Sequence, residues 1–213
     1  MSIEQVGGTD SKMYLSIIGW TLVQKVEEGS AGAKKRPYEK ADGTKSSKWE
    51  ISYKNLSGKI TGMTFKDGDF GEQFLLQLSD SDSNYQISMT TDGRYFTDFA
   101  KKLPNLELSE DITLNPYDFT TKEGKQLRGL SVVQDGEKIT SAYWDGEKTL
   151  GGMPEVSKED AKGYDKDDWK TYFISVKKFL KKEVATVTVV ATAVEGVTTT
   201  EAEDIFDDWS VPF

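Results

Sequence analysis

The alternation of apolar and polar residues predicts a chain built mainly of short strands. Residues 13–26 are rich in β-branched and aromatic types, which predicts one long strand bent at Gly19. Shorter runs predict strands at 48–53, 58–66, 74–78 and 84–89, and later at 112–114, 127–134 and 139–144. The polar segment 27–47 is rich in Gly and Lys and is typical of a long loop.

Two segments have helical rather than strand periodicity. Between Asp92 and Pro104, the apolar residues Tyr95, Phe96, Phe99, Ala100 and Leu103 recur at helical spacing. A second stripe comprises Trp169, Tyr172, Phe173, Val176 and Leu180, with acidic residues before it and lysines after it, as the helix dipole favours. We expect its aromatic side chains to lie in the core. For the Thr- and Val-rich residues 184–194, an edge strand and a linker both fit.

The order of strands, one helix and more strands predicts a mainly β fold with helices. An oligonucleotide-binding (OB) barrel has five strands with a helix between the third and the fourth, and this order fits the pattern. A C-terminal helix and a disordered acidic tail would follow the barrel. We therefore expect a domain at 11–194 and a flexible tail at 195–213. A β-sandwich with an added helix would give a similar pattern.

Composition excludes several kinds of chemistry. The 213 residues include no Cys and no His, which excludes disulfides, thiolate sites and histidine-dependent catalysis. The segment starting at Asp80 begins like a calcium loop, but Tyr85 and Thr91 occupy positions that require Gly and Glu. We find no phosphate-binding Gly-rich motif and no nucleophile motif. These observations predict a protein that is not an enzyme and has no metal site and no cofactor.

The sequence also favours a cytoplasmic protein that does not contact a membrane. Its N-terminus lacks a basic region followed by an apolar segment, and no apolar run is long enough to cross a bilayer. The absence of Cys agrees with a reducing compartment.

The net charge of −9 is unevenly distributed. The six acidic residues of 195–213 account for two thirds of this value, and that segment contains no Lys or Arg. Between Lys34 and Lys59 the balance reverses to +5, because eight basic residues meet three acidic ones. The distribution of charge is thus compatible with a polyanionic ligand, although the total is not.

Cations and aromatic residues are interleaved in the segment 34–54. Lys and Arg neutralise phosphates, while Tyr and Trp rings stack on unpaired bases whatever their sequence. This chemistry predicts binding of single-stranded nucleic acid. An ordinary solvated loop with Trp49 turned into the core is the alternative, and Phe74 and Tyr85 extend the surface if they lie on an exposed face. The candidate residues are Lys34, Lys35, Arg36, Tyr38, Lys48, Trp49, Tyr53, Lys54, Phe74 and Tyr85.

Three motifs resemble the single-stranded DNA-binding proteins of tailed bacteriophages: Tyr14 to Gly19, Trp49 to Ile60 and Phe99 to Pro104. The resemblance covers about residues 11–145. It implies an OB barrel that coats single-stranded DNA without strong sequence preference during phage replication, recombination or repair, in the cytoplasm of a bacterial host. A non-enzymatic β-sandwich adaptor or virion protein, docked through its acidic tail, is the alternative.

The final residues resemble the C-terminal peptide of bacterial single-stranded DNA-binding proteins, which ends in acids followed by an apolar residue, Pro and Phe. Here Trp209 and Ser210 separate the acids from Val211-Pro212-Phe213, which departs from that pattern. The resemblance implies that the tail recruits replication or recombination proteins. Competition between the tail and DNA for the same cations is a further expectation. The partner-binding candidates are Asp204, Phe206, Asp207, Asp208, Trp209, Pro212 and Phe213.

Overall fold

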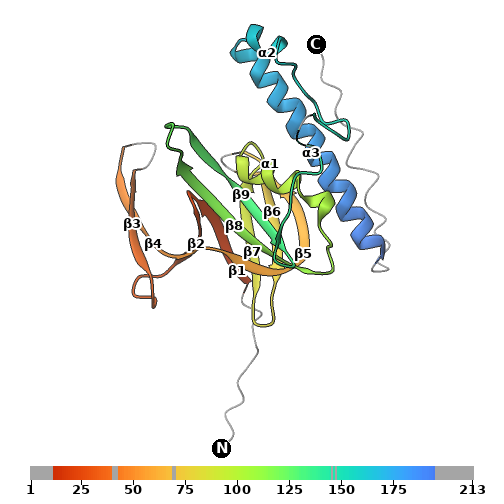
Figure 1. Cartoon of the computed structure of the whole chain (residues 1–213). Coiled ribbons are helices and arrows are strands. Elements are labelled where there is room, and N and C mark those ends of the chain that lie inside the picture. The colour runs from red at the N-terminus through yellow and green to blue at the C-terminus, as the bar shows by residue number, and fades with distance from the viewer. Residues whose placement is uncertain (1–11, 40–42, 69–70, 145, 147, 195–213) are drawn as a thin grey trace, which may run out of the picture.

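The computed structural model describes residues 12–39, 43–68, 71–144, 146 and 148–194 (Figure 1). The predicted tail and its partner-binding residues, 204–213, lie outside the described residues, as does the start of the predicted domain. Within the described part, the fold is mainly β. The strands are β1 Lys12–Ile18, β2 Thr21–Val26, β3 Lys34–Glu39, β4 Lys45–Tyr53, β5 Leu56–Lys66, β6 Gln73–Ser79, β7 Asn84–Thr90, β8 Asp111–Thr120, β9 Gln126–Gln134 and β10 Glu137–Lys138. The helices are α1 Arg94–Ala100, the 3-10 turn η1 Leu103–Asn105, α2 Asp160–Gly163 and α3 Lys166–Val194.

All ten strands of the described chain belong to one open sheet, in the order β10-β9-β8-β5-β6-β7-β1-β2-β4-β3. The prediction of a five-stranded barrel is therefore wrong. Strands β5 to β9 alone would have the order β9-β8-β5-β6-β7, and closing them would require β7 to pair with β9. Instead, β1 pairs in parallel with β7 and occupies that edge. The single sheet also differs from the two packed sheets of a sandwich.

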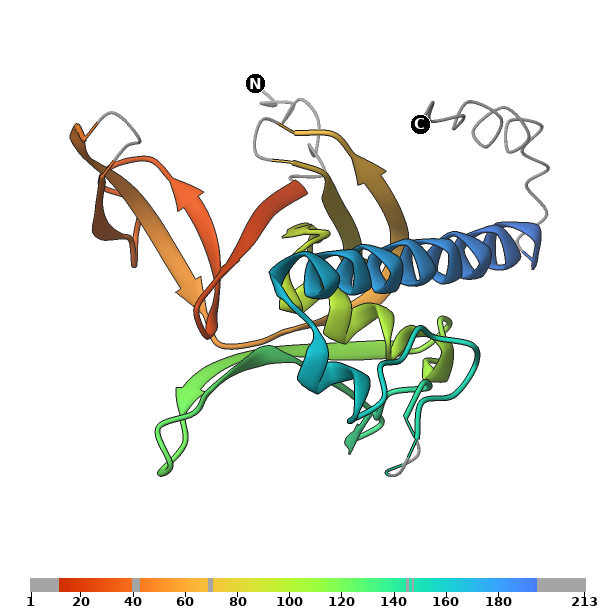
Figure 2. The same cartoon turned by 90° about the horizontal axis from the view of Figure 1, so that it is seen from above.

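The predicted loop at 27–47 contains a strand that the sequence analysis missed. Lys34–Glu39 pairs with β4 in an antiparallel hairpin, and the predicted strand at 13–26 is split into β1 and β2 by a turn at Gly19. Gly19 has a φ of +58°, a left-handed conformation that glycine adopts without steric cost. Strands β1 to β4 form an arm that extends from the rest of the sheet (Figures 1 and 2). Both faces of the β3–β4 hairpin lie largely outside the core, so its strands carry many charged residues. This composition is the reason that β3 was predicted as a loop.

The core lies on one face of the curved sheet and is built by alternation along each strand. Phe74, Leu76 and Leu78 on β6 are fully buried, as are Ile87 on β7 and Leu114 on β8. The ring of Phe74 contacts those of Phe65, Phe96 and Phe99, with centroids 5.2–5.7 Å apart. This aromatic cluster joins α1 to the sheet.

The helix predicted between Asp92 and Pro104 is confirmed as α1, and it covers the part of the β9 edge that β10 leaves unpaired. The Asp98 carboxylate accepts a hydrogen bond from the backbone N–H of Leu130 at 3.0 Å, and Lys102 Nζ donates to the Leu130 carbonyl. Burial lowers the pKa of Lys102. The neighbouring Gly129 is required by this contact, because a Cβ there would lie 2.0 Å from Asp98 Oδ2. The helix thus takes the place of a strand partner at the gap between β7 and β9.

The predicted C-terminal helix is confirmed, and it continues through residues 184–194 to Val194. Asp165 accepts hydrogen bonds from the backbone N–H groups of Asp167 and Asp168 and so caps its start. Val176, Leu180 and Val184 are buried against the core at helical spacing. Tertiary packing of Val184 therefore outweighs the preference of β-branched residues for strands.

The strand predicted at 139–144 is wrong. After the Asp135-Gly136 turn, only Glu137–Lys138 pair with β9, and the following residues run toward α3. There the Tyr143 hydroxyl donates a hydrogen bond to Glu183 at 3.1 Å. Burial, followed by this bond, raises the pKa of Tyr143 to about 12.

We expect Phe74→Ala to lower the free energy of unfolding by about 3–5 kcal/mol, because the substitution leaves a cavity in the aromatic cluster. Urea denaturation of the full chain measures the change. Phe119→Ala is the matched control, since Phe119 is 53 % exposed and its loss should have a small effect. Equal effects of the two substitutions would contradict the position of Phe74 in the core.

We expect stability to fall between about pH 10 and pH 12, partly through Tyr143. Its pKa is raised in the folded state, so its contribution is complete below the unfolded pKa near 10 and is lost as the pH rises through 12. Tyr143→Phe should make the unfolding free energy less dependent on pH in this window, as measured by urea denaturation at successive pH values. An unchanged pH dependence in the variant would contradict the burial of the Tyr143 hydroxyl beside Glu183.

Candidate nucleic-acid interface

The β3–β4 hairpin divides the predicted binding residues between two faces of the sheet. Residues paired directly across two antiparallel strands share a face, and neighbours along a strand alternate. The register pairs Arg36 with Lys48 and Lys35 with Trp49. The predicted cluster is therefore not one surface.

The first face carries Lys25, Lys34, Arg36, Tyr38 and Lys48, and we call it the basic face. The Lys48 ammonium lies 4.8 Å from the centroid of the Tyr38 ring, in cation–π geometry. In the strand register, Lys25 on β2 lies opposite Glu50 on β4, and Glu50 lies opposite Lys34 on β3. Four cations and one aromatic ring thus occupy adjacent positions on two hairpins.

Glu50 is the acidic residue at the centre of the basic face. It is buried, and its carboxylate accepts two hydrogen bonds from Arg36, at 2.6 Å from Nε and 2.8 Å from Nη2. The hydrogen bond to Glu50 raises the pKa of Arg36. Arg36 is thus held by a bidentate pair that fixes β3 on β4, and its charge is already largely neutralised within the protein.

The opposite face of the hairpin carries Lys35, Trp49 and Tyr53. The Lys35 ammonium lies 5.9 Å from the Trp49 ring, and the Tyr53 hydroxyl donates to Gln24 at 2.8 Å. Trp49, Ile51 and Tyr53 share this face, as alternation predicts, and Tyr53 packs against the core. Lys54 follows the end of β4 and is exposed.

Two aromatic residues predicted to bind nucleic acid, Phe74 and Tyr85, instead stabilise the fold. Phe74 is completely buried, so it has no surface on which a base could stack, and its inclusion among the binding residues is wrong. Its strand alternates so that Phe74, Leu76 and Leu78 all face the core. Tyr85 is half-buried and its hydroxyl donates to Asp80 at 2.7 Å, which lowers the pKa of Asp80. Tyr85 therefore fastens the β6–β7 turn.

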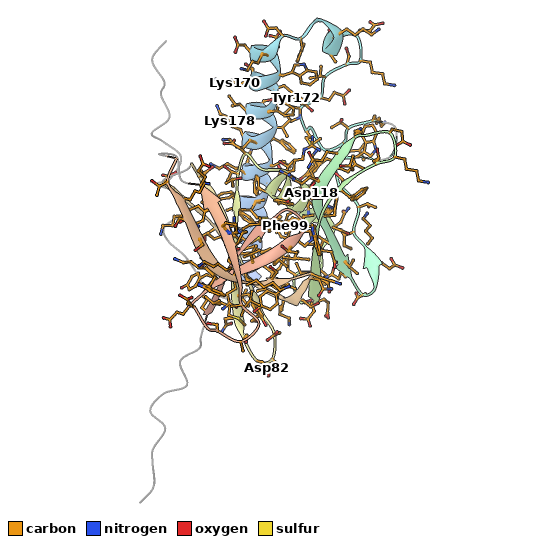
Figure 3. All side chains as sticks on the ribbon, turned by 90° about the vertical axis from the view of Figure 1, so that its left-hand side faces the viewer. Asp82, Phe99, Asp118, Lys170, Tyr172 and Lys178 are labelled. Carbon is orange, nitrogen blue, oxygen red and sulfur yellow. The ribbon has the colours of Figure 1, made fainter. Side chains whose placement is uncertain are left out.

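A groove of about 520 Å³ opens where β1, β6 and β7 meet α1 and β9. Its polar lining includes Gln73, Ser88, Arg94, Tyr95, Gln126 and Arg128. Figure 3 looks onto the side of the molecule that carries the arm and the β8–β9 hairpin, with Asp118 labelled on the hairpin. The groove shares Ser16 with the sheet surface that continues through Val23 to Lys25, so it adjoins the basic face.

The two arginines of the groove differ in how they are held. Arg128 donates to Asp118 at 2.9 Å from Nε, and Gln126 donates to the same carboxylate at 2.8 Å. The hydrogen bonds from Gln126 and then Arg128 lower the pKa of Asp118, so this carboxylate is charged at neutral pH. Arg94, at the start of α1, is exposed and forms no ion pair with a described residue. Arg94 is therefore the more available cation.

The turn at Gly19, between β1 and β2 of the arm, is held beside the groove by α1. The Tyr95 hydroxyl on α1 donates a hydrogen bond to the carbonyl of Gly19 at 2.5 Å. Burial raises the pKa of Tyr95, so its hydroxyl remains a donor at a higher pH than that of an exposed tyrosine. One helix thus positions both the groove and the turn from which β2 enters the arm.

Three exposed aromatic residues near this region were missed by the sequence analysis: Tyr14, Trp20 and Phe119, which are 63 %, 54 % and 53 % exposed. Alternation supplies the signal for two of them. Leu15 faces the core, so its neighbour Tyr14 faces outward. On β8, the residues 112, 114 and 116 are buried, so Phe119 falls on the opposite, outward face. Tyr14 shares its face with Ser16 and therefore with the groove.

Other kinds of site receive no support within the described residues. They contain no group of three or more acidic residues placed to hold a metal ion. No helix among them is both long and apolar enough to cross a membrane. Comparisons with models of protein families, with curated proteins and with solved structures found no match.

We expect Arg36→Ala to lower the unfolding free energy by roughly 1–3 kcal/mol, because it leaves the buried Glu50 carboxylate without its bidentate donor. Urea denaturation measures the loss, and Lys34→Ala, on the same face, is the control with little expected effect. The double variant Arg36→Ala/Glu50→Gln should recover part of the stability. A stable Arg36→Ala protein would show that the pair contributes little.

Proposed function

We propose that this protein binds single-stranded DNA without strong sequence preference and without enzymatic activity. The observation that carries the proposal is the sheet surface that joins the basic face to the groove. Along it, Lys25, Lys48 and Arg94 supply positive charge, and Tyr14 and Tyr38 supply aromatic rings. Cations that follow a backbone and rings that stack on bases are what a sequence-independent single-strand site requires.

The connectivity of β5 to β9 supports the same proposal. Three antiparallel strands, the helix α1 and a two-stranded hairpin follow one another, and the fourth strand, β8, pairs with the first, β5. The OB fold is a five-stranded, partly open barrel that binds oligonucleotides on its second and third strands and on two of its loops. We propose that β5–β9 are an opened form of this fold. The corresponding strands here are β6 and β7, whose Gln73 and Ser88 line the groove.

The proposed path of the strand runs from the β8–β9 loop, across the groove, and onto the arm. Lys122 and Lys125 are exposed in that loop, and Arg94 follows at the groove. Tyr14 and Lys25 lead to Lys48 and Tyr38 on the arm. The arm thus extends the surface that β6 and β7 alone would offer. By the resemblance to phage proteins, the biological role would be in replication, recombination or repair of phage DNA, with proteins of these processes as partners of the tail.

We expect the full chain to bind labelled oligo-dT with an affinity that falls with salt. Contact with about three to five phosphates predicts a log–log slope of roughly −2 to −4. Fluorescence anisotropy at several salt concentrations measures the slope, and an rU oligonucleotide compares RNA with DNA. No binding, or binding that does not depend on salt, would refute the proposed function.

Variants in the same assay test the proposed path. Lys25→Glu/Arg94→Glu should weaken binding at least tenfold through lost phosphate contacts, and Tyr14→Ala should weaken it about five- to 100-fold if one base stacks there. Lys158→Glu/Lys162→Glu and Trp144→Ala alter exposed residues between β10 and α3 and are the matched controls. Equal losses in the controls would show that overall charge, rather than this surface, determines binding.

A further inference from the structure

The first turns of α3 extend beyond the sheet (Figure 1). Aromatic residues of these turns are left uncovered, Phe173 above all. Trp169, Tyr172 and Phe173 contact one another, with ring centroids 5.3–6.0 Å apart, and Tyr164 completes the cluster. The expectation that all three α3 rings are core residues is wrong for Phe173, which is 61 % exposed. Trp169 is also only partly buried and is not part of the core cluster, whereas Tyr172 packs against that cluster. It continues the helix stripe of Val176, Leu180 and Val184, but the sheet does not reach it. A large exposed ring next to Ile174, itself 40 % exposed, is typical of a contact surface.

Positive charge surrounds this exposed ring. We call Lys170, Phe173, Ile174, Lys177 and Lys178 the α3 patch, because they are neighbours at spacings of three and four residues. Lys177 binds Asp92 at 2.7 Å. Lys170 and Lys178 are exposed and form no ion pair with a described residue, and both lie where α3 rises beyond the arm (Figure 3). The α3 patch therefore suits a ligand that is both acidic and apolar.

The chain itself contains a segment of this chemistry directly after α3. Residues 195–213 carry six acidic residues and no basic one, and Ile205, Phe206 and Trp209 lie among the acids. Residues 67–93 also combine six acids with aromatic residues and lack Lys and Arg, but that segment contributes β6 and β7 to the sheet. We propose that residues 204–209 bind the α3 patch of the same chain, running antiparallel to the helix.

The lengths involved permit this contact. Lys178 lies about 24 Å before Val194 along the helix, at 1.5 Å per residue. Residues 195–204 span up to about 33 Å when extended, so Asp204 can return to Lys178. From there, Asp208 lies about 13 Å further along an extended chain, and Lys170 lies about 12 Å further along the helix. Two acids thus match two available cations, while Phe206 falls between them, near Phe173 and Ile174.

This proposal does not depend on DNA binding, and it differs from competition between the tail and DNA. A tail held on α3 leaves the basic face open, and a partner protein would have to displace the tail from a helix. The two arrangements predict different distances from the tail to the arm.

Distances between spin labels on the full chain test the proposal. The sequence contains no Cys, so labels attach only at introduced positions. We expect Ser210→Cys/Thr171→Cys to give a narrow, short distance distribution by double electron–electron resonance. Ser210→Cys/Ser47→Cys, with the second label on the arm, should give a long, broad one. Lys170→Glu/Lys178→Glu should abolish the short distance, whereas the matched control Lys158→Glu/Lys162→Glu should preserve it.

Three results would overturn the proposal. The short distance to residue 171 could be absent. A short distance could instead appear to residue 47 and be lost on adding oligo-dT, which would place the tail on the arm. The short distance to residue 171 could also disappear when labelled protein is diluted into unlabelled protein, which would show exchange of tails between copies. Persistence through dilution and through oligo-dT addition supports binding within one chain at the α3 patch, even if the oligonucleotide does not bind.

Discussion

The contact between α1 and Leu130 is the interaction on which the rest of the structure depends. An exposed strand edge needs partners for its N–H and C=O groups, and at β9 the side chains of Asp98 and Lys102 supply them. The edge of β7 is occupied by β1. Because both edges are satisfied separately, the five strands β5–β9 do not close on one another. The open arrangement gives the sheet an arm and leaves a groove between the arm and α1.

The same arrangement brings cations of distant segments onto one side of the sheet. The chain is acidic overall, but the cations of the basic face, together with Arg94 of α1 and Arg128 of β9, lie along one connected surface. Some of them are committed to the fold: Arg36 is bound by the buried Glu50, and Arg128 by Asp118. The cations proposed to contact DNA are those without such partners, above all Arg94. The proposal therefore assigns structural and binding roles to different residues of the same type.

Local patterns predicted both main helices and most strands, because periodicity reports which side of an element is buried. They failed where the partner of a segment is distant in sequence. The charged segment 34–39 forms a strand because β4 offers it a complete ladder, which composition does not reveal. Residues 184–194 form a helix because Val184 meets the core. Phe173 has the spacing of a core residue, yet the sheet ends before it.

The sequence by itself determined the exclusion of histidine and cysteine chemistry, the concentration of acids after residue 194, and the grouping of Trp49, Ile51 and Tyr53 on one face. These follow from composition and from the alternation of a strand. Only the tertiary structure decided that Lys35 and Arg36 face opposite sides, that Phe74 is buried, and that Arg94 meets β1 at a groove. The physical reason is that faces and edges acquire their environment from segments many residues away. Strand pairing and packing select those segments, and local pattern does not encode them.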